Sequence, residues 1–401
     1  MVYMKEEKLT LSLTGKDSHE FILEPGRGDF SIGTKGLSKG EYDVWIEKED
    51  TINWDTLNYH YNPLFKEQAK RPYGFWPRWV KYSGNDTGWI DWCKKRSLEE
   101  FEWFPQKDMT VHLEDANIST LTIHSNYRII LFIKDKVNYL KLDGNLENYQ
   151  IAKCEQVPAL SFNFQKSKTK QKSYRLPDFP TLHLAIDVTI WNDVNQKPFD
   201  CTSLLQFSNL ENIALIGNVE NLDALQNLKN LKKIGLWNIP NLSGMPNLND
   251  FKYLTKVIAV NIEEKGGKKL RRELIKIKKT KKLEYSSVCK LRNRTWFEIQ
   301  ASNYFSEWSN QTEKKALAAY QVCLQKVKNA KEVAEVKSAM VEFITQIKQL
   351  RNIETPEWDD VYLALCNLME KSSLAVNSKT WLDWFYETKD EESNSVNLSK
   401  R

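Results

Sequence analysis

Apolar residues follow one another at intervals of three through the middle of the chain, and each run ends in two apolar residues separated by one other residue. The clearest runs are Leu204, Phe207 and Leu210 before Ile213 and Leu215; Leu222, Leu225, Leu228 and Leu231 before Ile234 and Leu236; and Leu242, Met245, Leu248, Phe251 and Leu254 before Val257 and Ala259. Because side chains alternate between the two faces of a strand, each terminal pair predicts a short strand with two inward side chains. The residues spaced by three are predicted to line the opposite wall of the same core.

Weaker versions of this pattern precede the clear ones. The terminal pairs predict strands at 121–123, 140–142, 160–162, 182–184, 213–215, 234–236 and 257–259. One such unit cannot bury its apolar face alone, whereas stacked units share a continuous core. We therefore predict a parallel sheet whose strands lie in chain order.

A polar residue follows the strand in the first five units. These positions are Asn126, Asn145, Gln165, Asp187 and Asn218. A buried amide at such a position can hydrogen-bond the backbone of the adjoining loop. The pattern L-x-x-L-x-L-x-x-N, repeated at about 20 residues, resembles that of leucine-rich-repeat proteins of the bacterial, cytoplasmic type, over about 150 of the 401 residues. The resemblance implies a curved α/β solenoid that binds protein partners.

The regions on either side of the repeats have different compositions. Residues 1–107 are predicted to form an N-terminal cap domain with strands at 9–13 and 41–46. The second half of this region is crowded with aromatic residues, which are Trp54, Tyr73, Phe75, Trp76, Trp79, Tyr82, Trp89, Trp92, Trp103 and Phe104. Such a cluster favours a compact cap that covers the first repeat. A surface for a ligand or for stacked bases is the alternative.

The repeats are assigned to residues 108–264, and a basic segment follows at 265–289. Within 265–282, ten basic residues face one acid, Glu273. We interpret this segment as a linker or terminal repeat whose inward residues are Leu270, Leu274, Ile275 and Ile277. Contact with a phosphate backbone is the alternative, although the lysines have no aromatic residues between them.

Helical periodicity begins near residue 296. The sequence predicts helices over 312–329, 331–350, from Thr355 onward and over 380–387. Thr355 and Pro356 form a typical helix start, with a capping hydroxyl before a proline. Residues 290–388 are therefore assigned to a C-terminal helical bundle, and the polar tail at 389–401 is expected to be disordered.

The chain lacks the motifs of the common enzyme classes. It contains no P-loop, G-x-G-x-x-G, H-E-x-x-H or G-x-S-x-G sequence, its five histidines lack ligand spacing, and its six cysteines form no C-x-x-C. We therefore predict no catalysis, no cofactor and no metal. The first residues lack an apolar signal region, and no apolar run is long enough to span a membrane, so we expect a cytoplasmic protein.

The residues beside and between the inward pairs are predicted to form the partner-binding concave face. The candidates are Tyr139, Lys141, Asp143, Asn163, His183, Asn212, Lys233, Trp237 and Lys256. Tyr139 and Trp237 are the expected anchors, because aromatic residues supply much of the energy of protein interfaces. Cover of this surface by the C-terminal helices is the alternative. A long segment at 187–198 is interpreted as an inserted loop, either functional or merely tolerated.

Taken as a whole, these features predict a monomeric, non-catalytic protein that binds another protein. Repeat proteins without catalytic motifs resemble bacterial immunity proteins, which neutralise toxins. The net charge of +5 is modest, so nucleic acid is the less favoured partner. The alternatives are a nucleic-acid-associated protein that uses the lysine-rich segments and an enzyme with an unrecognised site in the N-terminal region.

Overall fold

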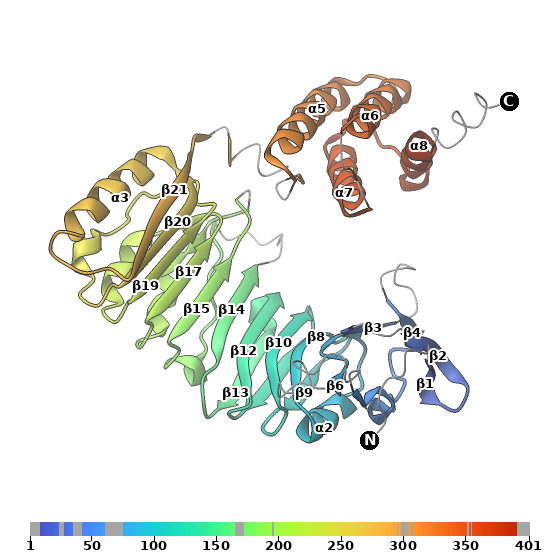
Figure 1. Ribbon diagram of the computed structural model, residues 1–401, viewed down its shortest axis with the longest axis horizontal. Helices are drawn as coiled ribbons and strands as arrows, with labels where there is room; N and C mark the ends of the chain where they lie inside the picture. The colour runs from blue at the N-terminus through green and yellow to red at the C-terminus, as the bar shows by residue number, and fades with distance from the viewer. Residues whose placement is uncertain are drawn as a thin grey trace. The chain divides into compact units, whose positions relative to one another are not determined.

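The computed structural model describes residues 9–23, 28–34, 42–60, 75–164, 172–194, 196–294, 296–297, 304–305, 308–350, 353 and 355–390. The chain divides into two compact units, Met1–Asn293 and Arg294–Arg401. The first unit contains the β-sheets, and the described part of the second is helical (Figure 1).

Twelve strands among the described residues form one sheet, and their pairings are all parallel. Their spatial order is β4, β3, β7, β8, β10, β12, β14, β15, β17, β19, β20, β21, which Figure 1 shows as one continuous row. The strands span Val44–Ile46, Asp29–Thr34, Trp79–Ser83, Leu98–Phe104, Ile118–Ser125, Val137–Gly144, Ala159–Phe164, Asp187–Trp191, Asn212–Ile216, Lys233–Trp237, Lys256–Glu263 and Tyr285–Arg292 in that order. The predicted parallel sheet is confirmed.

One face of this sheet is lined by two unbroken rows of buried side chains. Register pairs Leu121 with Leu140, and Ile123 with Leu142, and the same pairing continues from β3 to β20. The rows are Phe30, Val80, Phe101, Leu121, Leu140, Leu160, Val188, Ile213, Ile234 and Val257, and Ile32, Tyr82, Trp103, Ile123, Leu142, Phe162, Ile190, Leu215, Leu236 and Ala259. No member exposes more than 2% of its surface. We call this side the core face.

The strand predicted at 182–184 is wrong. Leu182 ends the 3-10 helix Pro180–Leu182, and Leu184 is exposed. The strand at this level of the sheet is β15, whose inward pair is Val188 and Ile190. β-Branched residues favour strands, and Val188-Thr189-Ile190 is such a run. Consequently the segment 187–198, expected to be a loop, begins as a strand.

Short elements between the strands carry the rest of the core. β9 (Met109–His112), β11 (Ile129–Ile133) and β13 (Tyr149–Cys154) form a three-stranded parallel sheet. Farther along lie two-residue strands β16 (Phe199–Asp200) and β18 (Val219–Glu220), which pair in parallel, and the 3-10 helices Leu146–Asn148, Cys201–Gln206, Leu222–Asn227 and Leu248–Asp250. Since a 3-10 helix repeats every three residues, residues spaced by three share one side. This explains why Leu222 and Leu225 are both buried.

Several of the N-terminal aromatic residues belong to the core, but Trp79 is 40% exposed and Tyr73 lies outside the described residues. Trp76, Trp89, Trp92 and Trp103 are buried, and α2 (Gly88–Lys95) supplies two of them. The remaining elements here are the antiparallel pairs β1 (Leu9–Gly15) with β2 (Ser18–Leu23) and β5 (Tyr59–His60) with β6 (Phe75–Trp76), and the 3-10 helix Trp54–Leu57. The large sheet includes β7 and β8, which both precede residue 108. It therefore begins before the position at which the sequence places the first repeat.

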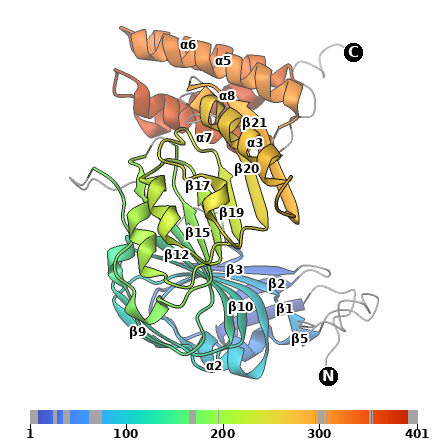
Figure 2. The same ribbon diagram turned by 90° about the vertical axis from the view of Figure 1, so that its left-hand side faces the viewer.

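The basic segment begins as helix α3 (Glu264–Ile277), which lies beside β20 and β21 (Figure 2). Leu270, Leu274 and Ile277 are buried, as predicted, but Ile275 is exposed because it lies on another side of the helix. β21 then adds a parallel strand. The sheet therefore also continues past residue 264.

The second unit contains α5 (Asn310–Asn329), α6 (Val333–Lys348), α7 (Thr355–Lys371) and α8 (Ser378–Asp390). These helices confirm the four predicted from periodicity, and buried residues such as Tyr320, Phe343 and Leu365 form a separate core. The tail from residue 391 lies outside the described residues. No helix in the described part of the chain is long and apolar enough to cross a membrane.

Candidate functional site

The strand residues that alternate with the buried pairs form the other face of the sheet, which we call the opposite face. Strand register arranges them in three rows. The first contains Trp79, Glu100, Thr120, Tyr139, Ala159, Asp187, Asn212, Lys233, Lys256 and Tyr285; the second Lys81, Glu102, Thr122, Lys141, Ser161, Thr189, Ala214, Gly235, Ile258 and Ser287; and the third Phe104, His124, Asp143, Asn163, Trp191, Ile216, Trp237, Val260 and Cys289.

The structure places all the predicted binding residues except His183 on this face. His183 follows a 3-10 helix, is exposed, and has Nδ1 2.7 Å from the carbonyl oxygen of Pro180. Thr189 occupies the second-row position that was predicted for His183, and Trp191 occupies the third-row position of the same strand. Glu100, Glu102 and Phe104 also lie on this face but were not predicted to, since β8 lies in the region assigned to the cap.

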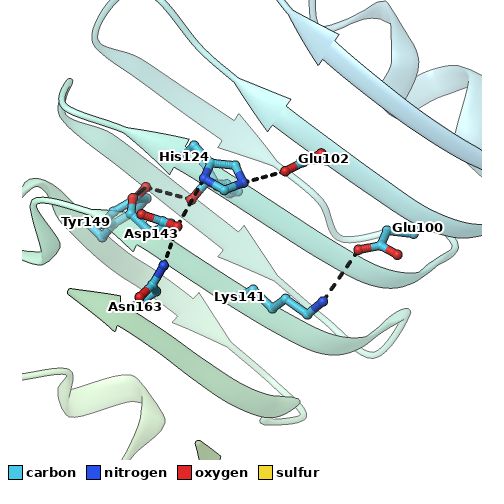
Figure 3. A network of polar contacts seen from close by, with 8 residues as sticks. Glu100, Glu102, His124, Lys141, Asp143, Tyr149 and Asn163 are labelled. Atoms are coloured by element: carbon cyan, nitrogen blue, oxygen red, sulfur yellow. Dashed lines mark hydrogen bonds and ion pairs between the residues drawn. The ribbon is translucent and has the colours of Figure 1, made fainter. Parts of the chain in front are cut away.

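A charged network crosses the strands β8, β10 and β12 (Figure 3). His124 lies between two carboxylates, with Nε2 2.8 Å from Oε1 of Glu102 and Nδ1 3.2 Å from Oδ2 of Asp143. The ring of Phe104 stacks on the imidazole, with centroids 4.3 Å apart. Three neighbouring strands are thus joined by side chains as well as by backbone hydrogen bonds.

The two carboxylates hold His124 in its charged form. Partial burial acts to lower the pKa of His124, but the hydrogen bonds to Asp143 and Glu102 outweigh it and raise this pKa to about 9. The hydrogen bond from His124 in turn lowers the pKa of Glu102. The arrangement is an ion triad rather than a catalytic dyad, because a histidine that stays protonated at neutral pH is a poor general base.

Further contacts hold the ends of this network. Asn163 donates to Oδ2 of Asp143 over 2.7 Å, and Nζ of Lys141 lies 3.5 Å from Oε1 of Glu100. From β13, the hydroxyl of Tyr149 lies 2.6 Å from the backbone oxygen of Asp143. We call the part of the opposite face on β7, β8, β10 and β12 the charged half.

Beyond β14 the third row becomes apolar. Register sets Trp191 beside Ile216, Ile216 beside Trp237, and Trp237 beside Val260. Trp191 exposes 49% of its surface, and the others are half-buried. The Trp237 indole lies over Gly235, where an added Cβ would come within 2.2 Å of Cζ3. We call the part of the opposite face on β15, β17, β19 and β20 the apolar half.

Polar residues border the apolar half along the first row. Asn212 donates to Oδ2 of Asp187 over 3.0 Å, Lys233 is exposed, and Nζ of Lys256 lies 5.7 Å from the ring centroid of Tyr285. The border therefore carries positive charge next to apolar surface.

The predicted amide positions divide into several structural roles. Asn145 caps the 3-10 helix that follows it, and Asn218 donates to the backbone oxygen of Gln196 over 2.8 Å. Asn126 is exposed, Asp187 begins a strand, and Gln165 lies outside the described residues. The buried amide that binds loop backbone is Asn192, whose Nδ2 donates to the oxygens of Lys197 and Asn218.

In the last strands the amides lie one position earlier than expected. Asn238 and Asn261 both adopt positive φ, 55° and 52°, and Asn261 donates to Oδ1 of Asn238 over 3.0 Å. Asparagine tolerates this left-handed conformation better than most residues. Both residues were missed because the polar position was expected at a fixed distance after each strand.

Part of the basic segment is committed to internal contacts. Nζ of Lys281 donates to the backbone oxygen of Phe251 over 2.7 Å, and Nε of Arg271 donates to that of Val288 over 2.9 Å. Lys268 and Lys269 form ion pairs with Glu264 and Glu273.

The described residues contain no group of three or more His, Cys, Asp or Glu side chains that could hold a metal ion. The six cysteines are free thiols, and Cys93, Cys201 and Cys323 are buried. Comparison of the chain with protein-family models, with curated proteins and with solved structures finds no match.

Proposed function

We propose that this chain is a non-catalytic, protein-binding solenoid of the leucine-rich-repeat type, and that its partner binds the apolar half of the opposite face. The observation that carries the proposal is the row of Trp191, Ile216, Trp237 and Val260, in which Trp191 is 49% exposed. Stacked units with a shared core are supported by the two unbroken rows of buried pairs.

An aromatic and aliphatic row on a sheet surface favours a protein partner. Contiguous exposed apolar surface is uncommon on monomeric proteins and marks interaction sites. Tryptophans at the centre of such a surface supply much of the binding energy when a partner removes them from water. Trp237 is additionally positioned by its contact with Gly235, so less conformational entropy is lost when it is buried.

The border of the apolar half specifies the charge of the partner. Lys233 is exposed and Lys256 is partly exposed beside Tyr285. Complementary charge steers association and selects partners. The proposed partner therefore presents an apolar anchor flanked by acidic side chains.

The test compares the full-length protein with the variants Trp191→Ala and Tyr253→Ala. Tyr253 is a matched control because it is an exposed aromatic residue in a turn outside the sheet. A partner captured with the wild-type protein is purified, and its affinity for each variant is measured by calorimetry. We expect at least tenfold weaker binding by Trp191→Ala and unchanged binding by Tyr253→Ala.

Equal affinity of the wild-type protein and Trp191→Ala for that partner would contradict the proposal. A fall in melting temperature with affinity retained would also contradict it, because the apolar half would then be structural.

A further inference from the structure

A pocket of about 420 Å³ opens at the N-terminal end of the opposite face, where it includes the first two strands of the charged half. Strands β3, β7 and β8 and the residues before β4 supply its walls. Its polar and aromatic lining consists of Asp29, Ser31, Tyr42, Asp43, Trp79, Lys81, Glu100 and Glu102.

The lining carries an excess of negative charge. Four of these side chains are carboxylates and one, Lys81, is a cation. Glu102 is engaged by His124, and Asp43 accepts hydrogen bonds from the backbone nitrogen and the hydroxyl of Ser31. Glu100 is partly exposed, and its contact with Lys141 is long, at 3.5 Å. A carboxylate held this loosely can exchange its partner for a better one.

The aromatic walls add a second feature that suits a cation. Trp79 remains 40% exposed even though the guanidinium of Arg78 lies 4.6 Å from its ring centroid. Nζ of Lys81 lies 4.9 Å from the ring centroid of Tyr42. Cations are attracted to aromatic faces, and most strongly to tryptophan.

An unmet hydrogen-bonding group lies next to the pocket wall. Register sets Thr122 between Glu102 and Lys141, and its side chain belongs to the same face. Thr122 is only 7% exposed, and its hydroxyl has no hydrogen-bond partner among the described residues. Buried polar atoms are rarely left in this state. Thr122 does not line the pocket, so the ligand assignment rests on the aromatic and carboxylate side chains that do.

We propose that this pocket binds the guanidinium group of an arginine side chain from a protein partner. A planar guanidinium stacks on an aromatic ring and pairs with a carboxylate at the same time, which an ammonium does less well. The chain itself shows this combination, because Arg78 lies over Trp79 and donates to both oxygens of Glu99 over 2.8 and 2.7 Å. In the pocket, Trp79 and Tyr42 are the aromatic walls and Glu100 is the pairing carboxylate.

The proposal is independent of the apolar half. It concerns different strands, a different ligand chemistry and different residues, so either can fail alone. A metal ion does not suit the site, because the described residues hold no suitable ligand group.

The probe is the peptide acetyl-Gly-Gly-Arg-Gly-Gly-amide, and binding to the full-length protein is followed by saturation-transfer NMR and calorimetry. Peptides with citrulline or lysine in place of arginine, and free agmatine, are the comparison ligands. We expect the arginine peptide to bind at least tenfold more tightly than the citrulline peptide, and more tightly than the lysine peptide and agmatine. Equal binding of citrulline or lysine would overturn the guanidinium assignment, and equal binding of agmatine would overturn the protein side chain as its source.

Variants then locate the site. Glu100→Gln and Trp79→Ala should each weaken binding at least tenfold, whereas the exposed controls Glu147→Gln and Tyr253→Ala should leave it unchanged. Lys81→Met should strengthen binding several-fold, because it removes the competing cation from Tyr42. This gain cannot arise from misfolding, so it keeps the test decisive if the weakening variants lose stability. Unchanged affinity in all three pocket variants would overturn the proposal.

Discussion

The charged half and the apolar half of the opposite face lie on one continuous sheet and cover one continuous core. They differ at the outward-facing positions, which alternate with the buried positions along each strand. Leu140 and Leu142 on β12 occupy the same buried rows as Ile234 and Leu236 on β19. The alternate positions are Tyr139, Lys141 and Asp143 on β12, but Lys233, Gly235 and Trp237 on β19. Because strand side chains alternate, one set of positions determines the fold and the other is free to carry different chemistry.

The two halves also differ in how they meet solvent. The charged network at the centre of the charged half is satisfied within the chain, since His124 is bound by Glu102 and Asp143, and Asn163 binds Asp143. The apolar half leaves Trp191 half exposed to water, where apolar surface is unfavourable unless a partner covers it. Charged groups can therefore be stabilised by one another within a surface, whereas an exposed apolar row gains stability only when a partner covers it.

The largest expected effect tests whether the two halves really share equivalent cores. Leu142→Ala and Leu236→Ala remove buried side chains from the same row of the core face, one behind each half, and each should cost roughly 2–5 kcal/mol of unfolding free energy. Urea unfolding followed by circular dichroism measures both. The exposed Leu184→Ala is the control and should change stability by less than about 0.5 kcal/mol. A large cost in one half alone would break the comparison.

The next effect belongs to the charged half and depends on pH. The pKa of His124 is raised to about 9 in the folded protein, so its stabilisation is complete below the unfolded value of about 6.5 and is lost as pH rises through about 9. His124→Asn should therefore cost roughly 1–3 kcal/mol at pH 6 and much less at pH 10. Unfolding measured across this range checks the expectation.

The control for this prediction is His183→Asn, which alters a histidine in an exposed turn. A cost for His124→Asn that does not depend on pH would show that the imidazole acts by packing on Phe104 rather than by its charge.

A smaller effect is expected in the apolar half. Gly235→Ala forces the Trp237 ring away, because the new Cβ would lie 2.2 Å from Cζ3, and should cost about 1 kcal/mol. In the Trp237→Ala background, Gly235→Ala should instead stabilise the protein by about 0.5 kcal/mol, since alanine loses less backbone entropy on folding. This double-mutant cycle measures the contact directly. Additive effects of the two substitutions would mean that the indole does not rest on Gly235.

The smallest effect is expected at the edge of the charged network. The pair between Lys141 and Glu100 is long and partly exposed, so Lys141→Met should change stability by less than about 0.5 kcal/mol. Thermal unfolding at low and high salt measures the contribution. A larger, salt-dependent loss would mean that the network extends to Lys141 as a cooperative unit.

The core face could be predicted from the sequence because burial requires apolar residues at both inward positions of each strand. The prediction failed at 182–184 because Leu176, Phe179 and Leu182 continue the three-residue spacing before the true strand. The predicted repeats also began too late in the chain, because two earlier strands of the same sheet were assigned to the cap. Val80 and Tyr82, like Phe101 and Trp103, are two buried residues separated by one other residue. These pairs recur at a spacing similar to that of the repeats, but aromatic residues replace leucines in them.

The charged network could not have been predicted in the same way. It needs the knowledge that positions 102, 124 and 143 align across three strands, and this alignment depends on the register between β8, β10 and β12. Apolar periodicity locates a strand within a residue or two, whereas a one-residue error in register moves a side chain to the other face. Asp143 was identified because its strand was placed correctly, and Glu102 was missed with its strand.

The last strand of the large sheet has a consequence for how the protein resists polymerisation. In the part of the chain that the structure describes, β21 pairs with β20 along one edge, and a free strand edge can recruit strands from other molecules. β21 carries the exposed Lys290 in a left-handed conformation, with φ of 51°, followed by Arg292. Charge and a local departure from regular strand geometry both oppose edge-to-edge pairing. At the other end, β4 is only three residues long, so both ends of the stack discourage fibril growth.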